Sequence, residues 1–263
     1  MKHFGLFVLL LFGFRGYTQQ TDYVDFKTAK ITIGIIPDSS RVIGMVDYQF
    51  KILKPVDSIF IDAINMTFES VSLNHETIPY SNDGKKLWLM HDFKNDSLYN
   101  VSFNYKAYPK KALYFIDWEN ENGNKQIWTQ GQGKYTSNWL PSIDDMNDKI
   151  EFDLNIRFDK HYEVIANGDL TNKQINDSTI TWHYNMHQPM SSYLVALAIG
   201  KYDKKVETAE SGIPLEMYYN AGKRLDITEY VYENEMSINK PKLYKSINFT
   251  YEESKNVLNE AYK

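Results

Sequence analysis

The segment Thr129-Gln130-Gly131-Gln132-Gly133 combines polar side chains with flanking glycines and is the stretch of the sequence most informative about function. Each glutamine amide can both donate and accept hydrogen bonds, and the neighbouring glycines would let a ligand or another backbone approach closely. The segment leads, through Trp139-Leu140-Pro141 and an acidic turn, into a regularly alternating run at 150–158. A regular strand after a polar loop would hold that loop in place. The alternative is a polar strand edge with glycine bulges.

The sequence lacks the usual motifs of a hydrolytic nucleophile and of a phosphate-binding loop. It has no cysteine, no G-x-S-x-G motif and no G-x-x-x-x-G-K-S/T loop. Asp144 and Asp145, with Asp148 nearby, could bind a cation, but their spacing does not follow the calcium-loop pattern. Acidic residues just before a strand more often accept hydrogen bonds within a turn. We expect that role for these three residues.

His183 and His187 have the i, i+4 spacing of zinc ligands on a helix. The surrounding Ile180, Trp182 and Tyr184 alternate, however, which predicts an extended strand. Two residues four apart on a strand are separated by about 13 Å, at ~3.3 Å per residue, whereas zinc–ligand bonds are roughly 2 Å long. No glutamate directly follows His183, where a metalloprotease has its general base. The sequence therefore predicts neither a metal site nor a catalytic residue.

Most of the sequence alternates between apolar and polar residues with period two, as half-buried strands do. Turn-forming Asn, Asp, Gly and Pro separate the alternating runs, and the 15% content of aromatic residues also favours sheet. The expected fold is mainly β: a large multi-stranded β-sandwich or saddle domain with a short helical C-terminal tail. The residues expected to share buried faces are Ile31, Ile33 and Ile35; Val46, Tyr48, Phe50 and Ile52; Tyr99, Val101, Phe103 and Tyr105; Ile150, Phe152, Leu154, Ile156 and Phe158; and Ile180, Trp182 and Tyr184.

Two further segments complete the predicted organisation. The run Tyr193–Ile199 is apolar throughout, which predicts a central strand covered on both faces. From about residue 222 the sequence is rich in Glu and Lys and predicts helices with thin apolar faces. The expected parts are a signal peptide at 1–18, a β domain at 19–221 and a helical tail at 222–263. The tail would be the start of a further domain or a frayed appendage.

Residues 1–18 are typical of a secretory signal peptide, with a basic Lys2, an apolar run at 4–14 and small residues before position 19. The apolar run is too short to span a bilayer. We expect export to the periplasm, the cell surface or the medium, and no membrane span; a buried N-terminal strand or an uncleaved anchor is the alternative. Removal of 1–18 would lower the net charge from −5 to −7, because Lys2 and Arg15 leave with no acidic residue. Such an acidic chain does not suit nucleic acid.

Three sequence elements resemble the N-terminal domain of the aminopeptidase N family, zinc exopeptidases that include leukotriene hydrolase. The first spans residues 129–152. It is similar to the family's T-Q-x-E/Q element, aromatic-Pro step, acidic turn and strand that begins with Lys, at matching intervals. In that order, its parts are Thr129-Gln130-Gly131-Gln132, Trp139-Leu140-Pro141, Asp144-Asp145 and Lys149-Ile150-Glu151-Phe152. Residues 188–200 resemble the family's P-M-S-T-Y-L strand, and Asn167-Gly168 resembles its V-x-S-N-G turn. The resemblance covers about 22–221.

The resemblance implies a role for each glutamine. Gln132 matches a position, commonly Glu, that contacts the free α-amine of the substrate, and Gln130 matches a residue that lines the first side-chain pocket. A glutamine oxygen without charge would hold an ammonium more weakly than a carboxylate. In the family this domain is a β-rich saddle that packs over a thermolysin-like zinc domain.

The family's G-x-M-E-N and H-E-x-x-H motifs are absent from this sequence. The resemblance therefore implies the substrate-side domain of an exported zinc aminopeptidase, inactive alone. It implies no cofactor in this chain, and zinc only in a catalytic domain supplied in cis or in trans. The implied ligand is a peptide with a free N-terminus, and the tail at 222–263 would be the truncated start of the catalytic domain.

A second interpretation is a non-catalytic peptide- or glycan-binding β-sandwich module. Exposed aromatic rings would then stack on sugars. The candidate rings are those of Trp88, Trp118, Trp128, Trp139 and Trp182. A third interpretation is a structural or assembly protein of the same ancestry.

Overall fold

The computed structural model describes residues 19–219. The predicted signal peptide at 1–18 and the predicted helical tail at 222–263 lie outside the described residues. The described residues fall into two compact units: residues up to 160 with 164–199, and 161–163 with 200–219. The domain limits 19–221 stay a prediction.

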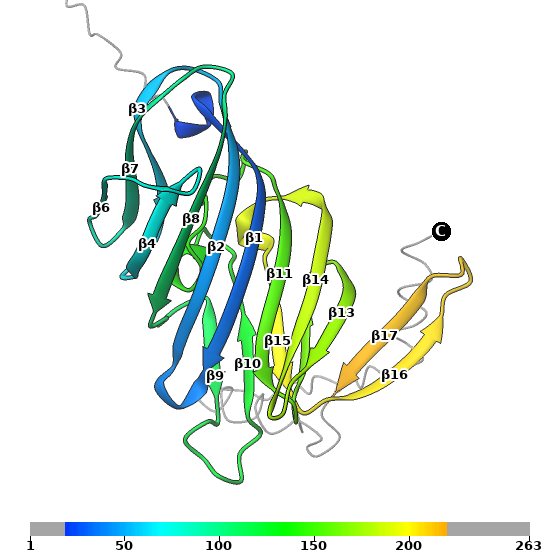
Figure 1. Cartoon of the computed structure of the whole chain (residues 1–263). Coiled ribbons are helices and arrows are strands. Elements are labelled where there is room, and N and C mark those ends of the chain that lie inside the picture. Colours follow the sequence, from blue (N-terminus) through cyan, green and yellow to red (C-terminus); the bar gives the residue numbers. More distant parts are fainter. Residues whose placement is uncertain (1–18, 220–263) are drawn as a thin grey trace, which may run out of the picture. The chain divides into compact units, whose positions relative to one another are not determined.

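The first unit is built on an eight-stranded mixed sheet with the order β13-β14-β11-β1-β2-β8-β4-β5 (Figure 1). Its inner strand β1 (Val24–Ile36) pairs antiparallel with β2 (Arg41–Ile52) and parallel with β11 (Ile150–Asp159). The remaining strands are β4 (Thr67–Leu73), β5 (Glu76–Thr77), β8 (Leu98–Ala107), β13 (Asp169–Ile175) and β14 (Thr179–Met190).

The buried face of this sheet is the one that the sequence predicts. In β11, Phe152 and Ile156 are buried while Glu151 and Arg157 are exposed, and the same alternation holds in β1, β2 and β8. Burial of each such side chain contributes roughly 1.5–3 kcal/mol. Asn155 departs from the pattern: it is buried, and its Nδ2 donates to the Ile31 carbonyl at 3.2 Å. The fold is mainly β, as expected.

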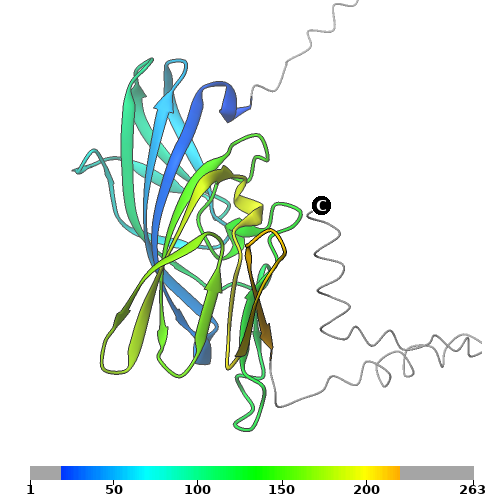
Figure 2. The same ribbon diagram turned by 90° about the vertical axis from the view of Figure 1, so that its right-hand side faces the viewer.

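Two smaller sheets accompany the large one. The three-stranded sheet has the order β3-β7-β6, with β3 (Val56–Asp62), β7 (Lys86–Phe93) and β6 (Tyr80–Asn82). The four-stranded sheet has the order β12-β15-β10-β9, with β12 (Glu163–Ala166), β15 (Leu197–Gly200), β10 (Gln126–Thr129) and β9 (Leu113–Ile116). Figure 2 shows β9 and β10 on one side of the large sheet. There the ring of Trp118 packs edge-to-face on Phe158 of β11, with centroids 5.9 Å apart.

The prediction of one central strand at Tyr193–Ile199 is wrong for its first half. Residues Ser192–Leu194 form a 3-10 turn, η4, and the strand β15 begins only at Leu197. Leu194 is 46% exposed, so this end of the run is not covered on both faces. The second half behaves as expected, because β15 lies between β12 and β10.

Two serine hydroxyls explain the turn at η4. Ser191 Oγ donates to the Met146 carbonyl at 2.8 Å, and Ser192 Oγ donates to the Ile143 carbonyl at 2.6 Å. Hydrogen bonds from short polar side chains compete with strand pairing for the local backbone. The apolar composition of the run therefore did not decide its conformation.

The second unit contains an antiparallel hairpin of β16 (Asp203–Thr208) and β17 (Pro214–Tyr219). Lys204 and Glu216 form an ion pair across it at 2.5 Å. The other 3-10 segments are η1 (Gln20–Asp22), η2 (Pro37–Ser39) and η3 (Thr136–Asn138). Among residues 19–219, no helix is long and apolar enough to cross a membrane.

Candidate functional site

Residues 130–135, which we call the glutamine loop, follow β10 directly. The strand ends at Thr129, so both glutamines lie in a loop and not within a strand edge. Gln130 and Gln132 are exposed, and neither side-chain amide has a hydrogen-bond partner among residues 19–219. Both amides are therefore available to a ligand.

Hydrogen bonds from two threonines hold the ends of the glutamine loop. At its start, the Thr129 hydroxyl accepts a bond from Leu197 N at 2.8 Å and donates to the Leu197 carbonyl at 3.3 Å. At its end, the buried Thr136 hydroxyl donates to the Ser192 carbonyl at 3.0 Å. Both anchors lie in the segment from η4 to β15. The threonine of the T-Q element thus positions the glutamines.

Two positions of the loop require glycine, one because of close packing and the other because of its backbone conformation. Gly131 lies so close to the backbone of Tyr193 that a Cβ at this position would stand 2.5 Å from the Tyr193 oxygen and 2.7 Å from Thr136 Oγ1. Gly133 has a φ of +88°, in the left-handed region that favours glycine. Tyr135 N donates to the Gly131 carbonyl at 3.2 Å and closes the loop. The backbone that approaches Gly131 is therefore the chain's own.

The acidic turn contacts the segment that follows the glutamine loop. The predicted role of its acids as hydrogen-bond acceptors within the turn holds for Asp144 and Asp145 but not for Asp148, which accepts a bond from the distant Phe26 backbone. The Asp144 carboxylate accepts hydrogen bonds from Ser142 Oγ at 2.9 Å and from the side chain and backbone of Ser137 in η3. Asp144 N in turn donates to Asp62 Oδ2 at 3.0 Å. Burial raises the pKa of Asp62 and of Asp144 above the ordinary value, whereas these hydrogen bonds and the charge of Lys134 act in the opposite direction.

Asp148 is the most deeply buried member of the acidic turn, with 6% of its surface exposed. Burial raises the pKa of Asp148 to about 7, and the nearby Asp25 carboxylate adds to the rise, against a hydrogen bond from the Phe26 backbone. Its Oδ2 has no hydrogen-bond partner within residues 19–219. In this described part of the chain, no group of three or more His, Cys, Asp or Glu side chains could hold a metal ion.

Residues 22–194 match the family described as the Peptidase M1 N-terminal domain. The chain belongs to this family. The resemblance to aminopeptidase N-terminal domains is thereby confirmed.

Relatives of this M1 N-terminal domain are aminopeptidases. The chain is 22% identical over 151 residues to a leucyl aminopeptidase of Saccharolobus solfataricus, covering 56% of this chain and 19% of that protein. It is 29% identical over 80 residues to the glutamyl aminopeptidase of Sus scrofa, covering 30% of this chain and 8% of that protein. The chain thus spans about a fifth or less of the length of these relatives.

A solved structure supports the same fold. The M1 zinc metallopeptidase of Deinococcus radiodurans superposes with a TM-score of 0.66 at 15% sequence identity, covering 78% of this chain and 49% of that one. At this level of identity the likeness concerns the fold of the M1 N-terminal domain alone. The chain spans about half of that structure.

The other residues that the sequence singled out have structural places in this M1 N-terminal domain. His183 and His187 lie on the extended strand β14, as predicted. Trp139 and Trp182 are 1% and 0% exposed, so neither ring can stack on a sugar. Trp128 is 37% exposed, and its ring lies 4.7 Å from that of Tyr114. Burial thus excludes two of the five candidate rings from sugar stacking, and the family match does not favour the glycan-binding interpretation.

Sequence reasoning missed three supports of the site: Asp62, Ser191 and Ser192. Asp62 ends an ordinary alternating strand, and its partner Asp144 lies 82 residues later. Ser191 and Ser192 could have been noticed as two hydroxyls at the start of an otherwise apolar run. No spacing pattern indicated which carbonyls they would reach.

Proposed function

We propose that this chain is the substrate-side domain of an aminopeptidase-like zinc metallopeptidase, and that its glutamine loop contacts the N-terminal residue of a peptide. The observation that carries the proposal is the pair of exposed amides, Gln130 and Gln132. They have no hydrogen-bond partner in residues 19–219, yet they stand on a backbone held at both ends. A preorganised loop with free polar groups loses little entropy when a ligand binds.

The two amides would have different roles. Gln132 Oε1 would accept a hydrogen bond from the peptide's α-ammonium group, and Gln130 would line the space for the first side chain. An amide oxygen is a weaker partner for an ammonium than a carboxylate, since a charge-assisted hydrogen bond is roughly twice as strong as a neutral one. The domain would therefore select for a free amine without holding it tightly.

The bond-breaking chemistry would belong to a catalytic zinc domain, joined in cis or supplied in trans. That domain would provide the metal that polarises the peptide carbonyl and activates water. No residue of 19–219 is assigned a catalytic step. We expect the chain by itself not to hydrolyse aminoacyl arylamides, even with added zinc.

Export of the protein is part of the proposal. A basic residue followed by an apolar run of signal-peptide length at 4–14 supports it. Expression of the whole chain followed by cell fractionation would test it. An exported product that starts near residue 19 is the expected result, and a cytoplasmic product that retains residues 1–18 would contradict it.

Binding of short peptides to the full chain tests the role of the loop. Trialanine amide and its N-acetyl form would be titrated at pH 6.5, where the free amine is charged, and binding would be followed by calorimetry or by NMR shifts. We expect weak binding of the free amine and at least tenfold weaker binding of the acetylated form. Gln132→Ala should abolish this difference, and Gln132→Glu should increase it severalfold.

Gln174→Ala is the matched control. Gln174 is an exposed glutamine on the edge strand β13, and its truncation should leave peptide binding unchanged. Equal binding of the free and the acetylated peptide by the parent chain would overturn the assignment of Gln132. The same conclusion would follow if Gln174→Ala and Gln132→Ala weakened binding to the same extent.

A further inference from the structure

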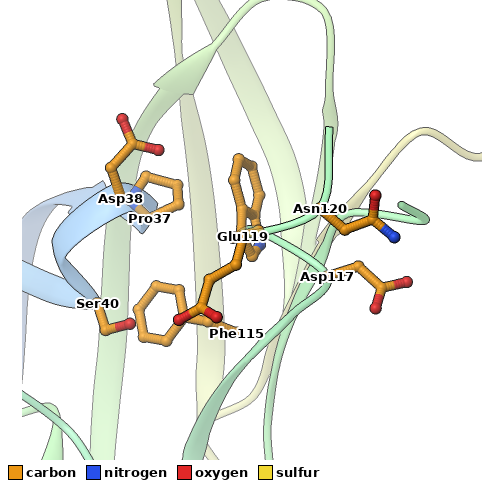
Figure 3. Close-up of a pocket in the computed structure, with 8 residues that line it drawn as sticks. Pro37, Asp38, Ser40, Phe115, Asp117, Glu119 and Asn120 are labelled. Carbon is orange, nitrogen blue, oxygen red and sulfur yellow. The ribbon is translucent and has the colours of Figure 1, made fainter. Parts of the chain in front are cut away.

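A recess of about 650 Å³ lies between the turn that joins β1 to β2 and the β9–β10 hairpin (Figure 3). The turn contributes Pro37, Asp38 and Ser40, and the hairpin contributes Phe115, Asp117, Trp118, Glu119 and Asn120. The strands β9 and β10 pair from Leu113–Thr129 at the glutamine loop to Ile116–Gln126 at the recess. At ~3.3 Å per residue the two ends are about 10 Å apart, so this recess is separate from the glutamine loop.

Three acidic side chains line the recess. Asp38 and Glu119 are exposed, and neither forms a salt bridge or a hydrogen bond with another residue of the described chain. In Figure 3 the Glu119 side chain extends toward Ser40 and Phe115. Asp117, by contrast, accepts a hydrogen bond from Asn124 N at 3.0 Å, which helps to fix the hairpin. Two carboxylates therefore remain available.

An aromatic wall stands beside these carboxylates. The Trp118 ring is held by its Nε1, which donates to the Gln126 carbonyl at 2.9 Å, and by the edge-to-face contact with Phe158. The ammonium group of Lys125 lies 5.7 Å from the centroid of this ring, within the range of a cation–π interaction. The wall is thus preformed, and an ammonium of the chain itself already lies against it.

We infer that this recess binds a small organic polycation of the polyamine class. Asp38 and Glu119, on opposite sides of the recess, would each pair with an ammonium group. The hydrocarbon segments of the ligand would lie on Pro37, Phe115 and Trp118, whose side chains offer no oxygen ligand to a metal ion. A neutral sugar would form no ion pair with either carboxylate. The inference stands apart from the proposed role of the glutamine loop.

Spermidine binding to the full chain tests the inference. Calorimetry at low ionic strength, with Trp fluorescence as a second readout, should show saturable binding that weakens as salt is added. The variant that combines Asp38→Asn with Glu119→Gln should bind at least tenfold more weakly. Both side chains are exposed and unpaired in the described residues, so the fold should not change.

Glu121→Gln is the matched control, because Glu121 is an exposed residue of the same hairpin that does not line the recess. It should bind spermidine as tightly as the parent chain does. If Glu121→Gln weakened binding as much as the double variant does, the loss would come from general surface charge and not from the recess. Absence of spermidine binding, or equal binding of Mg²⁺ or maltose, would overturn the inference. Arginine amide is a second ligand to be tested. If it competes with spermidine and binds more tightly than spermidine does, the natural ligand is a basic peptide and not a polyamine.

Gln132→Ala separates this site from the proposed peptide contact. This variant should retain spermidine binding in full, and the double variant of the recess should retain the preference for a free peptide amine. Failure of either proposal would therefore leave the other intact.

Discussion

Asp62, at the end of β3, accepts a 3.0 Å hydrogen bond from the backbone amide of Asp144, which lies 82 residues later. Around this contact, Asp62 and Ser142 also exchange two backbone hydrogen bonds, of 2.8 and 2.9 Å. The acidic turn at 142–144 is thereby fixed to β3 of the three-stranded sheet. On its other side the loop is fixed to the segment from η4 to β15. The loop that carries the exposed amides is thus held between the three-stranded sheet and the segment from η4 to β15, both of which are distant from it in sequence.

Asp144→Ala should lower the free energy of unfolding by about 1–3 kcal/mol, because it leaves donors of Ser137 and Ser142 without their acceptor. Chemical denaturation would measure the change. The exposed Asp169 on β13 offers a control, and its replacement by Ala should have little effect. Identical stabilities of the two variants would mean that the Asp144 hydrogen bonds do not support the loop.

Thr129→Val keeps the shape of the side chain but removes the hydroxyl that bonds both backbone groups of Leu197. We expect a loss of about 1–2 kcal/mol in unfolding free energy and faster hydrogen exchange at the amide of Leu197. Thr171 lies on the exposed edge strand β13, and Thr171→Val removes a hydroxyl that donates to the His183 carbonyl of β14. This control should lose much less stability, and parity between the two would argue against an anchoring role for Thr129.

Gly131→Ala should destabilise the chain by about 1–3 kcal/mol, since the new methyl group would overlap the Tyr193 carbonyl. Thermal unfolding would measure the loss, and proteolysis would report loosening of the loop. At Gly34 in β1 an added Cβ would meet Ile43 at an ordinary 3.6 Å. Gly34→Ala should therefore be tolerated. Tolerance at Gly131 as well would show that the loop can move away from Tyr193.

Asp148 should make the protein less stable as the pH rises through neutrality. Its carboxyl titrates near 3.8 when unfolded and at about 7 when folded. Between these values only the folded state holds the proton, so the free energy of unfolding falls as the pH increases, and it levels off above the folded pKa. Denaturation between pH 4 and 8 should show this slope, with smaller contributions of the same sign from Asp62 and Asp144.

Asp148→Asn should flatten this profile and be more stable than the parent at pH 8, by on the order of 2–4 kcal/mol. Near pH 4 the two proteins should differ little, because the carboxyl is then neutral in the folded state. An unchanged slope in the variant would show that Asp148 is charged in the folded protein at pH 5–7. Asp169→Asn, at an exposed position, should leave the slope as it is.

Alternation predicted the strands of the large sheet and their buried faces, because every second side chain of a half-covered strand must leave water. Ile31, Val46, Val101 and Leu154 are all buried as expected. The rule failed at Asn155, whose amide is buried with a backbone carbonyl as partner. It also failed at Leu194, where hydroxyl hydrogen bonds turned the chain out of the strand.

The sequence indicated the exposed residues of the candidate site but not the residues that hold them in place. Gln130 and Gln132 stood out by their type and by their glycine neighbours, but the atoms that hold them come from distant segments. The contacts of Thr136 with Ser192 and of Asp144 with Asp62 span 56 and 82 residues. Turn-forming residues also stand at Pro37-Asp38-Ser39 and from Asn120 to Asn124. Their meeting around one recess depends on how the sheets stack, which no local pattern encodes.

The parallel pairing of β1 with β11 constrains how the polypeptide matures. On its β11 side Thr28 pairs with Glu151, whereas on the other side it pairs with Gln49 of β2. A nascent chain that has not emerged past Asp159 therefore exposes one edge of the thirteen-residue strand β1. Contacts of such long sequence separation form slowly, and an open edge invites pairing with other chains. The large sheet therefore cannot be completed before β11 has been synthesised, and β1 presents an unpaired edge until then.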